Sequence, residues 1–230
     1  MKMKMMTNTL LLFLIFLLSG SHGADFNAPH KHSGLLKPYA VEKPSVQLDS
    51  KQKDALLAGK NVKEQLLQGD GGRAMVIQDV HAPPTVVWDR ILDFGSYNRM
   101  VPKVKTCENY DVTEEEDGSQ KIMTRMCLGV FGVKIEYFIE HCISTLENGQ
   151  KICTWTLDYN KSSDLDESVG YWYVEPHPDP EKPDWSRVFY SVALVPPGWI
   201  PGIVKNFLTK QALTQATAWV KEHSEKQHNA

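Results

Sequence analysis

The chain has 230 residues, and 42% of them are hydrophobic, which is enough for one globular domain with its own buried core. It carries 25 basic and 28 acidic residues, a net charge of -3. This balance excludes the broad basic surface of nucleic-acid-binding proteins, so we expect no nucleic-acid partner.

Residues 1–23 have the pattern of a secretory signal peptide. Lys2 and Lys4 precede the apolar run LLLFLIFLL, and small residues at 21–23 offer a cleavage site. The run is too short to span a bilayer. We therefore expect the mature protein in the secretory pathway, either secreted or in an organelle lumen. Residues 24–48 then form a flexible spacer, and 49–226 form one domain.

The first elements of that domain are a short helix, two strands and a second helix. Asp49 and Ser50 can cap a helix that Gly59 ends. Strands are expected over 61–67 and 72–80, around a glycine-rich turn. Two prolines then open a helix with an apolar face, followed by at most a short second helical turn.

Strands separated by turns fill the next part of the chain, because apolar and polar residues alternate and turn residues recur. We expect them over 104–112, 120–128, 133–144, 151–159, 168–175 and 187–195. The chain closes with a helix of about 25 residues that has an apolar stripe. The predicted class is α+β, with a curved antiparallel sheet of about seven strands around a long C-terminal helix and two short helices after strand one.

Three segments carry a resemblance to a known family: AMVIQDVHAPPTVVWDRILDFGSYNRMVPKV (74–104), GYWYVEP (170–176) and VFYSVALVPPGWIPGIVKNFL (188–208). With the order of elements, they resemble the START-like or helix-grip (SRPBCC) superfamily. Within it, the coenzyme-Q-binding START-domain and polyketide cyclase group is the most similar. The resemblance implies a cavity between sheet and helix for a small hydrophobic molecule that is quinone-, sterol-, lipid- or polyketide-like. Nothing in the residue spacing selects a quinone over a sterol.

Apolar and aromatic side chains on the strands and the last helix are candidates for the walls of this cavity. We expect the ligand-binding residues to be Met126, Trp155, Tyr171, Trp172, Tyr190, Val204, Phe207 and Leu208. A slip of one residue in register would exchange Tyr171 for Trp172. The same side chains could instead fill a closed core.

Two loop tips with apolar residues are expected at one end of the sheet, because alternate connections of a meander share an end. Val130 and Phe131 lie on one tip, and Trp199 and Ile200 lie on the other, between prolines. We interpret these four residues as a gate to the cavity, or as a patch for transient membrane contact. The alternative is that Trp199 packs under the start of the helix as a hydrophobic staple.

The four cysteines, Cys107, Cys127, Cys142 and Cys153, allow three disulfide pairings. A three-residue loop ending at Gly118 would place Cys107 opposite Cys127. Cys142 and Cys153 flank the next turn similarly. The alternative is four reduced cysteines packed as small hydrophobic residues.

Two further sequence features bear on modification and chemistry. Asn160 begins an Asn-Lys-Ser glycosylation motif. No nucleophile, zinc-protease or phosphate-loop signature occurs, and no histidine pair has metal-ligand spacing. We therefore assign no catalytic residue, metal or cofactor. The favoured function is a carrier or chaperone of a hydrophobic ligand; the alternatives are a polyketide cyclase or aromatase-like enzyme, and an interaction module with a filled core.

Overall fold

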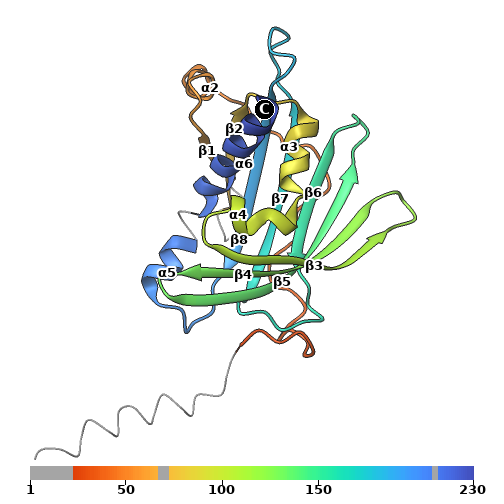
Figure 1. The fold of residues 1–230 in the computed structure, drawn as a ribbon, viewed down its shortest axis with the longest axis vertical. Coiled ribbons are helices and arrows are strands. Elements are labelled where there is room, and N and C mark those ends of the chain that lie inside the picture. Colours follow the sequence, from red (N-terminus) through yellow and green to blue (C-terminus); the bar gives the residue numbers. More distant parts are fainter. Residues whose placement is uncertain (1–22, 67–72, 209–211) are drawn as a thin grey trace, which may run out of the picture.

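The computed structural model describes residues 23–66, 73–208 and 212–230, so the predicted signal peptide lies almost wholly outside the described residues. Within them, one antiparallel sheet has the strand order β1-β2-β8-β7-β6-β5-β4-β3 (Figure 1). The predicted α+β class is confirmed, and all eight expected strand ranges belong to this sheet, which was predicted to have about seven strands. The strands are β1 Val62–Leu66, β2 Arg73–Val80, β3 Val104–Glu114, β4 Gln120–Val130, β5 Val133–Thr145, β6 Lys151–Leu157, β7 Glu167–Pro176 and β8 Ser186–Val195.

The helices gather mainly on one face of the sheet, where α6 packs against α3, β2 and β8 (Figure 1). Their bounds are α2 Ser50–Leu57, α3 Pro84–Ile91, α4 Tyr97–Met100, α5 Gly202–Asn206 and α6 Ala212–His228. The single long helix of the prediction is thus described as α5 and α6, and 209–211 between them lie outside the described residues. No helix in the described part is long and apolar enough to cross a membrane.

The sheet has an apolar cluster on each face, because successive side chains of a strand point in opposite directions. On β7, Trp172 and Val174 belong to the inner cluster beneath α3 and α6. Tyr171 and Tyr173 belong to the outer cluster, with Leu56 of α2. Both clusters are buried, so this sheet is covered on its two faces.

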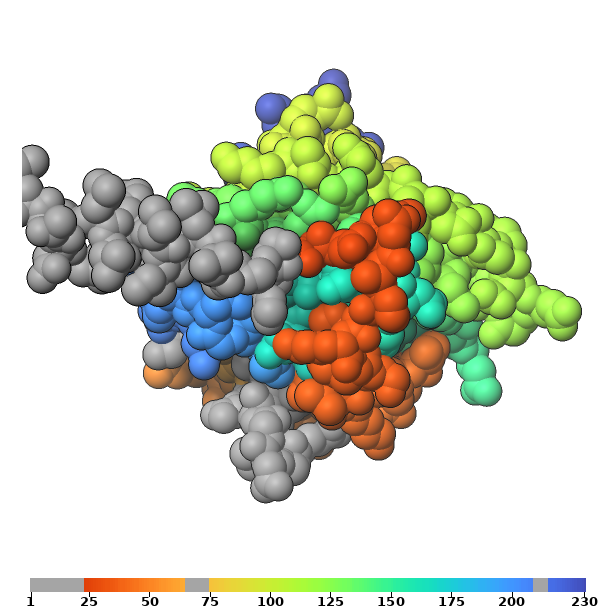
Figure 2. All heavy atoms as spheres, turned by 90° about the horizontal axis from the view of Figure 1, so that it is seen from below, coloured from red at the N-terminus to blue at the C-terminus, as the bar shows by residue number. Residues whose placement is uncertain are grey.

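The segment 24–48, predicted to be a flexible spacer, crosses the outer face of the sheet as a strap, and Figure 2 shows it in red and orange across the lower end of the molecule. Asp25 pairs with Ser162 through two backbone hydrogen bonds. Further along, Tyr39 contacts the Tyr171 ring edge-on, with ring centroids 4.9 Å apart. The strap has no regular secondary structure and no periodic pattern, and this is why the sequence did not reveal its contacts with the sheet.

The four cysteines are free, so the predicted disulfides are absent from the structure. The predicted hairpin register holds at Asp111, opposite Met123, but an irregularity between Asn109 and Asp111 shifts it by one residue. Cys107 therefore lies opposite Met126 and faces the inner cluster, while Cys127 pairs with Thr106.

The second predicted pair is also offset by one residue, although the β5–β6 register is regular: Cys153 lies opposite Ile143 and Cys142 lies opposite Thr154. A shift of one residue places the two thiols of each pair on opposite faces of the sheet. Burial raises the pKa of Cys107 to about 12, so its thiol stays protonated as a small apolar group.

Candidate ligand-binding cavity

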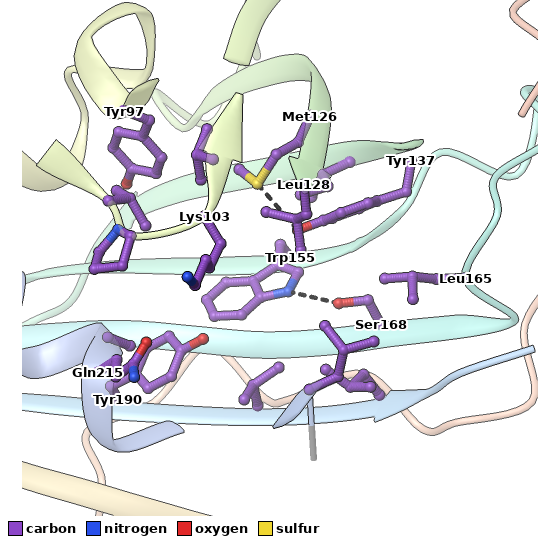
Figure 3. A pocket seen from close by; sticks show the side chains of 18 of the residues that line it. Tyr97, Lys103, Met126, Leu128, Tyr137, Trp155, Leu165, Ser168, Tyr190 and Gln215 are labelled. Carbon is purple, nitrogen blue, oxygen red and sulfur yellow. Dashed lines mark hydrogen bonds between the residues drawn. The ribbon is translucent and has the colours of Figure 1, made fainter. Parts of the chain in front are cut away.

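A cavity lies between the inner face of the sheet and the helices α4 and α6 (Figure 3). Of the eight predicted ligand-binding residues, six line it: Met126, Trp155, Trp172, Tyr190, Phe207 and Leu208. Val204 is buried in the adjoining inner cluster but does not line the cavity. The structure thus brings most of the predicted set together, and their contact with a ligand stays a prediction.

Tyr171 is the predicted residue that lies elsewhere, on the outer face of the sheet. Its hydroxyl donates to the Met75 sulfur at 2.9 Å, and its ring belongs to the outer cluster. Trp172, the next residue, points inward instead. The one-residue ambiguity of the sequence is settled in favour of Trp172, since each step along a strand reverses the face.

Trp155 of β6 forms the floor of the cavity because Gly170 opposite it has no side chain. A Cβ built at Gly170 would lie 2.1 Å from the Trp155 ring, closer than atoms can approach. The indole therefore lies across β7 and stacks on Tyr190, with centroids 5.7 Å apart. Its Nε1 donates to Ser168 Oγ at 3.3 Å. We expect any larger residue at position 170 to displace the floor.

His141 of β5 is a polar group buried in the wall. Its Nε2 lies 3.1 Å from Thr124 Oγ1, and its ring stacks on Phe94 with centroids 4.4 Å apart. Burial lowers the pKa of His141 to about 3, because the charged imidazolium would lose its hydration. The imidazole is therefore neutral at physiological pH and behaves as a hydrogen-bonded wall residue.

The roof comes from the helical segment that carried much of the family resemblance. Phe94 and Tyr97 pack against each other, and Tyr97 meets Trp219 of α6 edge-on at 5.1 Å. The Tyr97 hydroxyl donates to the Ile91 carbonyl and so anchors α4 to the end of α3. Aromatic residues at these spacings thus hold two helices over the sheet.

The cavity has a volume of about 160 Å³. An apolar cavity of about 150 Å³ accepts one benzene-sized molecule, whereas drug-sized ligands need roughly 300–1,000 Å³. In this shape the cavity holds a single ring or a short chain. A sterol, a quinone or a dye with three aromatic rings would enter only if the walls moved apart.

The predicted gate residues divide into an exposed and a buried pair. Phe131 is 61% exposed and Trp199 is 48% exposed, whereas Val130 and Ile200 are buried in the inner cluster. It is therefore Ile200, and not Trp199, that packs inside the protein. Phe131 meets Phe207 of the cavity wall edge-on at 6.1 Å, so one exposed tip directly adjoins the cavity.

The loop tips do share one end of the sheet, as the strand register shows. Val130 pairs with Val133 at the β4–β5 turn, and Glu167 pairs with Val195 where β8 ends. Val195 and Ile203 are exposed apolar residues in the same region. Asn160 is exposed in the β6–β7 connection, and its glycosylation stays a prediction.

Other residues that line the cavity were not predicted as site residues. They are Tyr97, Lys103, Tyr137, Ile139, His141, Ser168, Gln215, Ala216 and Trp219, with several aliphatic neighbours. Tyr137 and Ile139 stand two residues apart in the alternating pattern of β5, which places them on one face, so the sequence contains a signal for both. For the helical residues the apolar stripe and the family resemblance were signals of burial, but helix packing decides which of them meet the cavity. Among the described residues, no group of three or more metal-ligating side chains is placed to hold an ion.

An open antiparallel sheet gripping a C-terminal helix over an apolar cavity defines a START-like, helix-grip protein. The structure resembles the STAR-related lipid transfer protein of Xanthomonas axonopodis, with a TM-score of 0.56 and 11% identity over 78% of this chain and 97% of that one. It also resembles human StAR-related lipid transfer protein 5, with a TM-score of 0.56 and 12% identity over 73% of this chain and 83% of that one. These likenesses show the fold.

A family model shows which group the chain belongs to. Residues 74–225 match the model of the polyketide cyclase / dehydrase and lipid transport family, and the chain is a member of that family. The match covers β2 to most of α6, which are the elements that enclose the cavity. No curated protein matches the sequence.

Proposed function

We propose that this protein binds a small hydrophobic ligand in the cavity and acts as its carrier or chaperone. The observation that carries the proposal is the apolar, aromatic cavity between the sheet and α6. Stacked rings such as Trp155 and Tyr190 offer a flat apolar surface to a ring or chain. A filled interaction module would have no such space, so the cavity favours a ligand over a closed core.

The cavity favours binding over catalysis. A general base works best with a pKa near the working pH, whereas burial lowers the pKa of His141 to about 3. Burial also raises the pKa values of the Tyr97, Tyr137 and Tyr190 hydroxyls well above their usual range. These groups stay neutral and suit hydrogen bonding more than proton transfer, which weakens the cyclase alternative.

We propose that the exposed tips at Phe131 and Trp199 form the entry side of the cavity and touch a membrane while the ligand transfers. Four exposed apolar side chains lie in this region: Phe131, Val195, Trp199 and Ile203. Exposed apolar residues gathered together often mark a contact surface. We also propose that the chain enters the secretory pathway through its signal peptide and is then secreted or stays in an organelle lumen.

Native mass spectrometry of the mature chain purified from a eukaryotic secretory host tests this function. We expect a hydrophobic adduct in stoichiometric amount, identifiable after solvent extraction. The same spectrum reports cleavage of the predicted signal peptide, a glycan on Asn160 and the thiol state of the cysteines. A protein that is empty and fails to take up fatty acids, sterols or quinones would contradict the carrier function.

A further inference from the structure

The polar groups of the cavity wall fall into two sets. Among lining residues with a hydroxyl, imidazole, amine or amide group, four are hydrogen-bonded within the protein: Tyr97, Tyr137, His141 and Ser168. In the described part of the chain, Lys103, Tyr190 and Gln215 also line the cavity, and no side-chain hydrogen bond or ion pair is present for them. The second set is therefore available to a ligand.

Lys103 is an exposed residue, as Lys105 is, and it is the only charged side chain among the described residues that line the cavity. It lies between Pro102 and Val104, which also line it, and the Gly129 amide donates to its carbonyl at 2.9 Å. Its backbone is left-handed, with φ of +71°, a strained conformation for a residue other than glycine. Strain of this kind persists where the surroundings hold a residue in place, and it is concentrated at functional sites.

The three available groups lie toward one end of the cavity. Figure 3 shows Lys103 pointing in from the start of β3, with Tyr190 and Gln215 on the same side of Trp155 and Leu165 on the other. At the Leu165 end, the polar groups of Ser168 and Tyr137 are already hydrogen-bonded within the protein. The other end has one cation and two neutral hydrogen-bonding groups without such partners. This asymmetry matches a ligand with an apolar body and a polar head.

We propose that the ligand is an amphipathic monoanion of the carboxylate type, whose head group pairs with the Lys103 ammonium. Tyr190 and Gln215 would supply neutral hydrogen bonds to the same end. A single lysine is a point charge, and the described lining has no arginine fork, so a single negative charge suits it better than a phosphate dianion. This inference rests on the proposed function, because it assigns the class of ligand that the same cavity carries.

A pair of dyes with the same rings tests the head group directly. Anilinonaphthalene sulfonate is an anion, and phenylnaphthylamine is its uncharged parent; both fluoresce when bound in apolar sites. We expect Lys103→Met to weaken binding of the sulfonate by about tenfold, the loss typical of one hydrogen bond to a charged group. Binding of the parent should not change. Displacement of the parent by dodecanoate but not by dodecanol extends the test to a carboxylate.

Two further variants control for folding and for general surface charge. Lys103→Gly removes the same charge while relieving the positive φ, so it should lose sulfonate binding without loss of stability. Lys105→Met removes an exposed lysine two residues away that does not line the cavity, and it should change neither dye.

The possible failures are distinguishable. If neither dye binds the wild-type protein, and a single-ring probe such as benzene, which fits a cavity of about 160 Å³, does not bind either, the proposed function itself fails. If both dyes bind and Lys103→Met leaves the sulfonate unaffected, or if Lys105→Met weakens it equally, only the anionic-head inference is overturned. In that case, a loss of binding to anionic vesicles in Lys103→Met would assign Lys103 to a membrane surface instead.

Discussion

At the scale of single residues, Phe131 has a backbone conformation that is unfavourable for a residue with a side chain. The β4–β5 turn has two central residues, Phe131 and Gly132, with φ of +48° and +81°. Two-residue turns with positive φ at both positions prefer Asn-Gly or Asp-Gly. A left-handed conformation costs a residue other than glycine about 1–2 kcal/mol. An exposed aromatic ring held at this cost is consistent with a role at the entry to the cavity.

We predict that Phe131→Asn has opposite effects on stability and on ligand transfer. Asparagine tolerates the left-handed turn, so relief of backbone strain should raise the free energy of unfolding by about 1 kcal/mol. Loss of the contact between Phe131 and Phe207 reduces this gain. Transfer of phenylnaphthylamine between the protein and lipid vesicles should slow, because an apolar tip is lost. Urea unfolding and stopped-flow fluorescence measure the two effects.

A matched change away from the cavity separates this effect from general loss of apolar surface. Leu57 is an exposed apolar residue at the end of α2, and Leu57→Asn should leave the transfer rate unchanged. If Phe131→Asn transfers ligand as fast as the wild-type protein does, the tip has no part in entry.

At the scale of elements, the strap decides how the outer face of the sheet is covered. The His30 ring nitrogen lies 3.1 Å from the Asp166 carbonyl, and the Leu35 amide donates to the buried Glu167 carboxylate at 2.6 Å. Lys43 forms an ion pair with Glu175 at 2.6 Å. These contacts fasten the strap along β7, the strand whose inner face carries Trp172. The strap therefore belongs to the domain and supports the wall of the cavity.

We predict that Tyr39→Ala lowers the free energy of unfolding by about 2 kcal/mol, because it removes the ring against Tyr171 and leaves the Ser191 hydroxyl without this partner. Val41→Ala, an exposed change in the same strap, should stay within about 0.5 kcal/mol of the wild-type value. Chemical denaturation compares the two variants. Equal, small effects of the two substitutions on the free energy of unfolding would mean that the strap is a spacer that does not stabilise the fold.

At the scale of the whole molecule, the succession of strands along the chain and the α+β class could be predicted, because alternation and turn residues recur regularly. The predicted start of β3 at 104 and of β5 at 133 agree with the structure. What could not be predicted is how far each strand slips against its neighbour. A single irregularity beside Tyr110 moved Cys107 away from Cys127, and such a local bulge leaves no periodic signal.

The residues of the cavity also divide into those that the sequence predicts and those that it does not. Residues on strands, such as Trp155 and Tyr190, could be assigned to the cavity because the sequence pattern predicted their strands and the faces on which they lie. Lys103 and Gln215 could not, because their places depend on how the helices and the start of β3 close over the sheet. The volume of the cavity also depends on that packing, down to the absence of a side chain at Gly170.

The most direct test of the central claim is to fill the cavity and measure ligand binding. Ala216 lines the cavity from α6, whereas Ala218 on the same helix is exposed. We predict that Ala216→Phe folds but binds phenylnaphthylamine at least tenfold more weakly, while Ala218→Phe binds it as the wild-type protein does. Fluorescence titration gives the dissociation constants, and circular dichroism confirms the fold. A correctly folded Ala216→Phe protein that binds the dye with unchanged affinity would place the ligand outside this cavity and contradict the account.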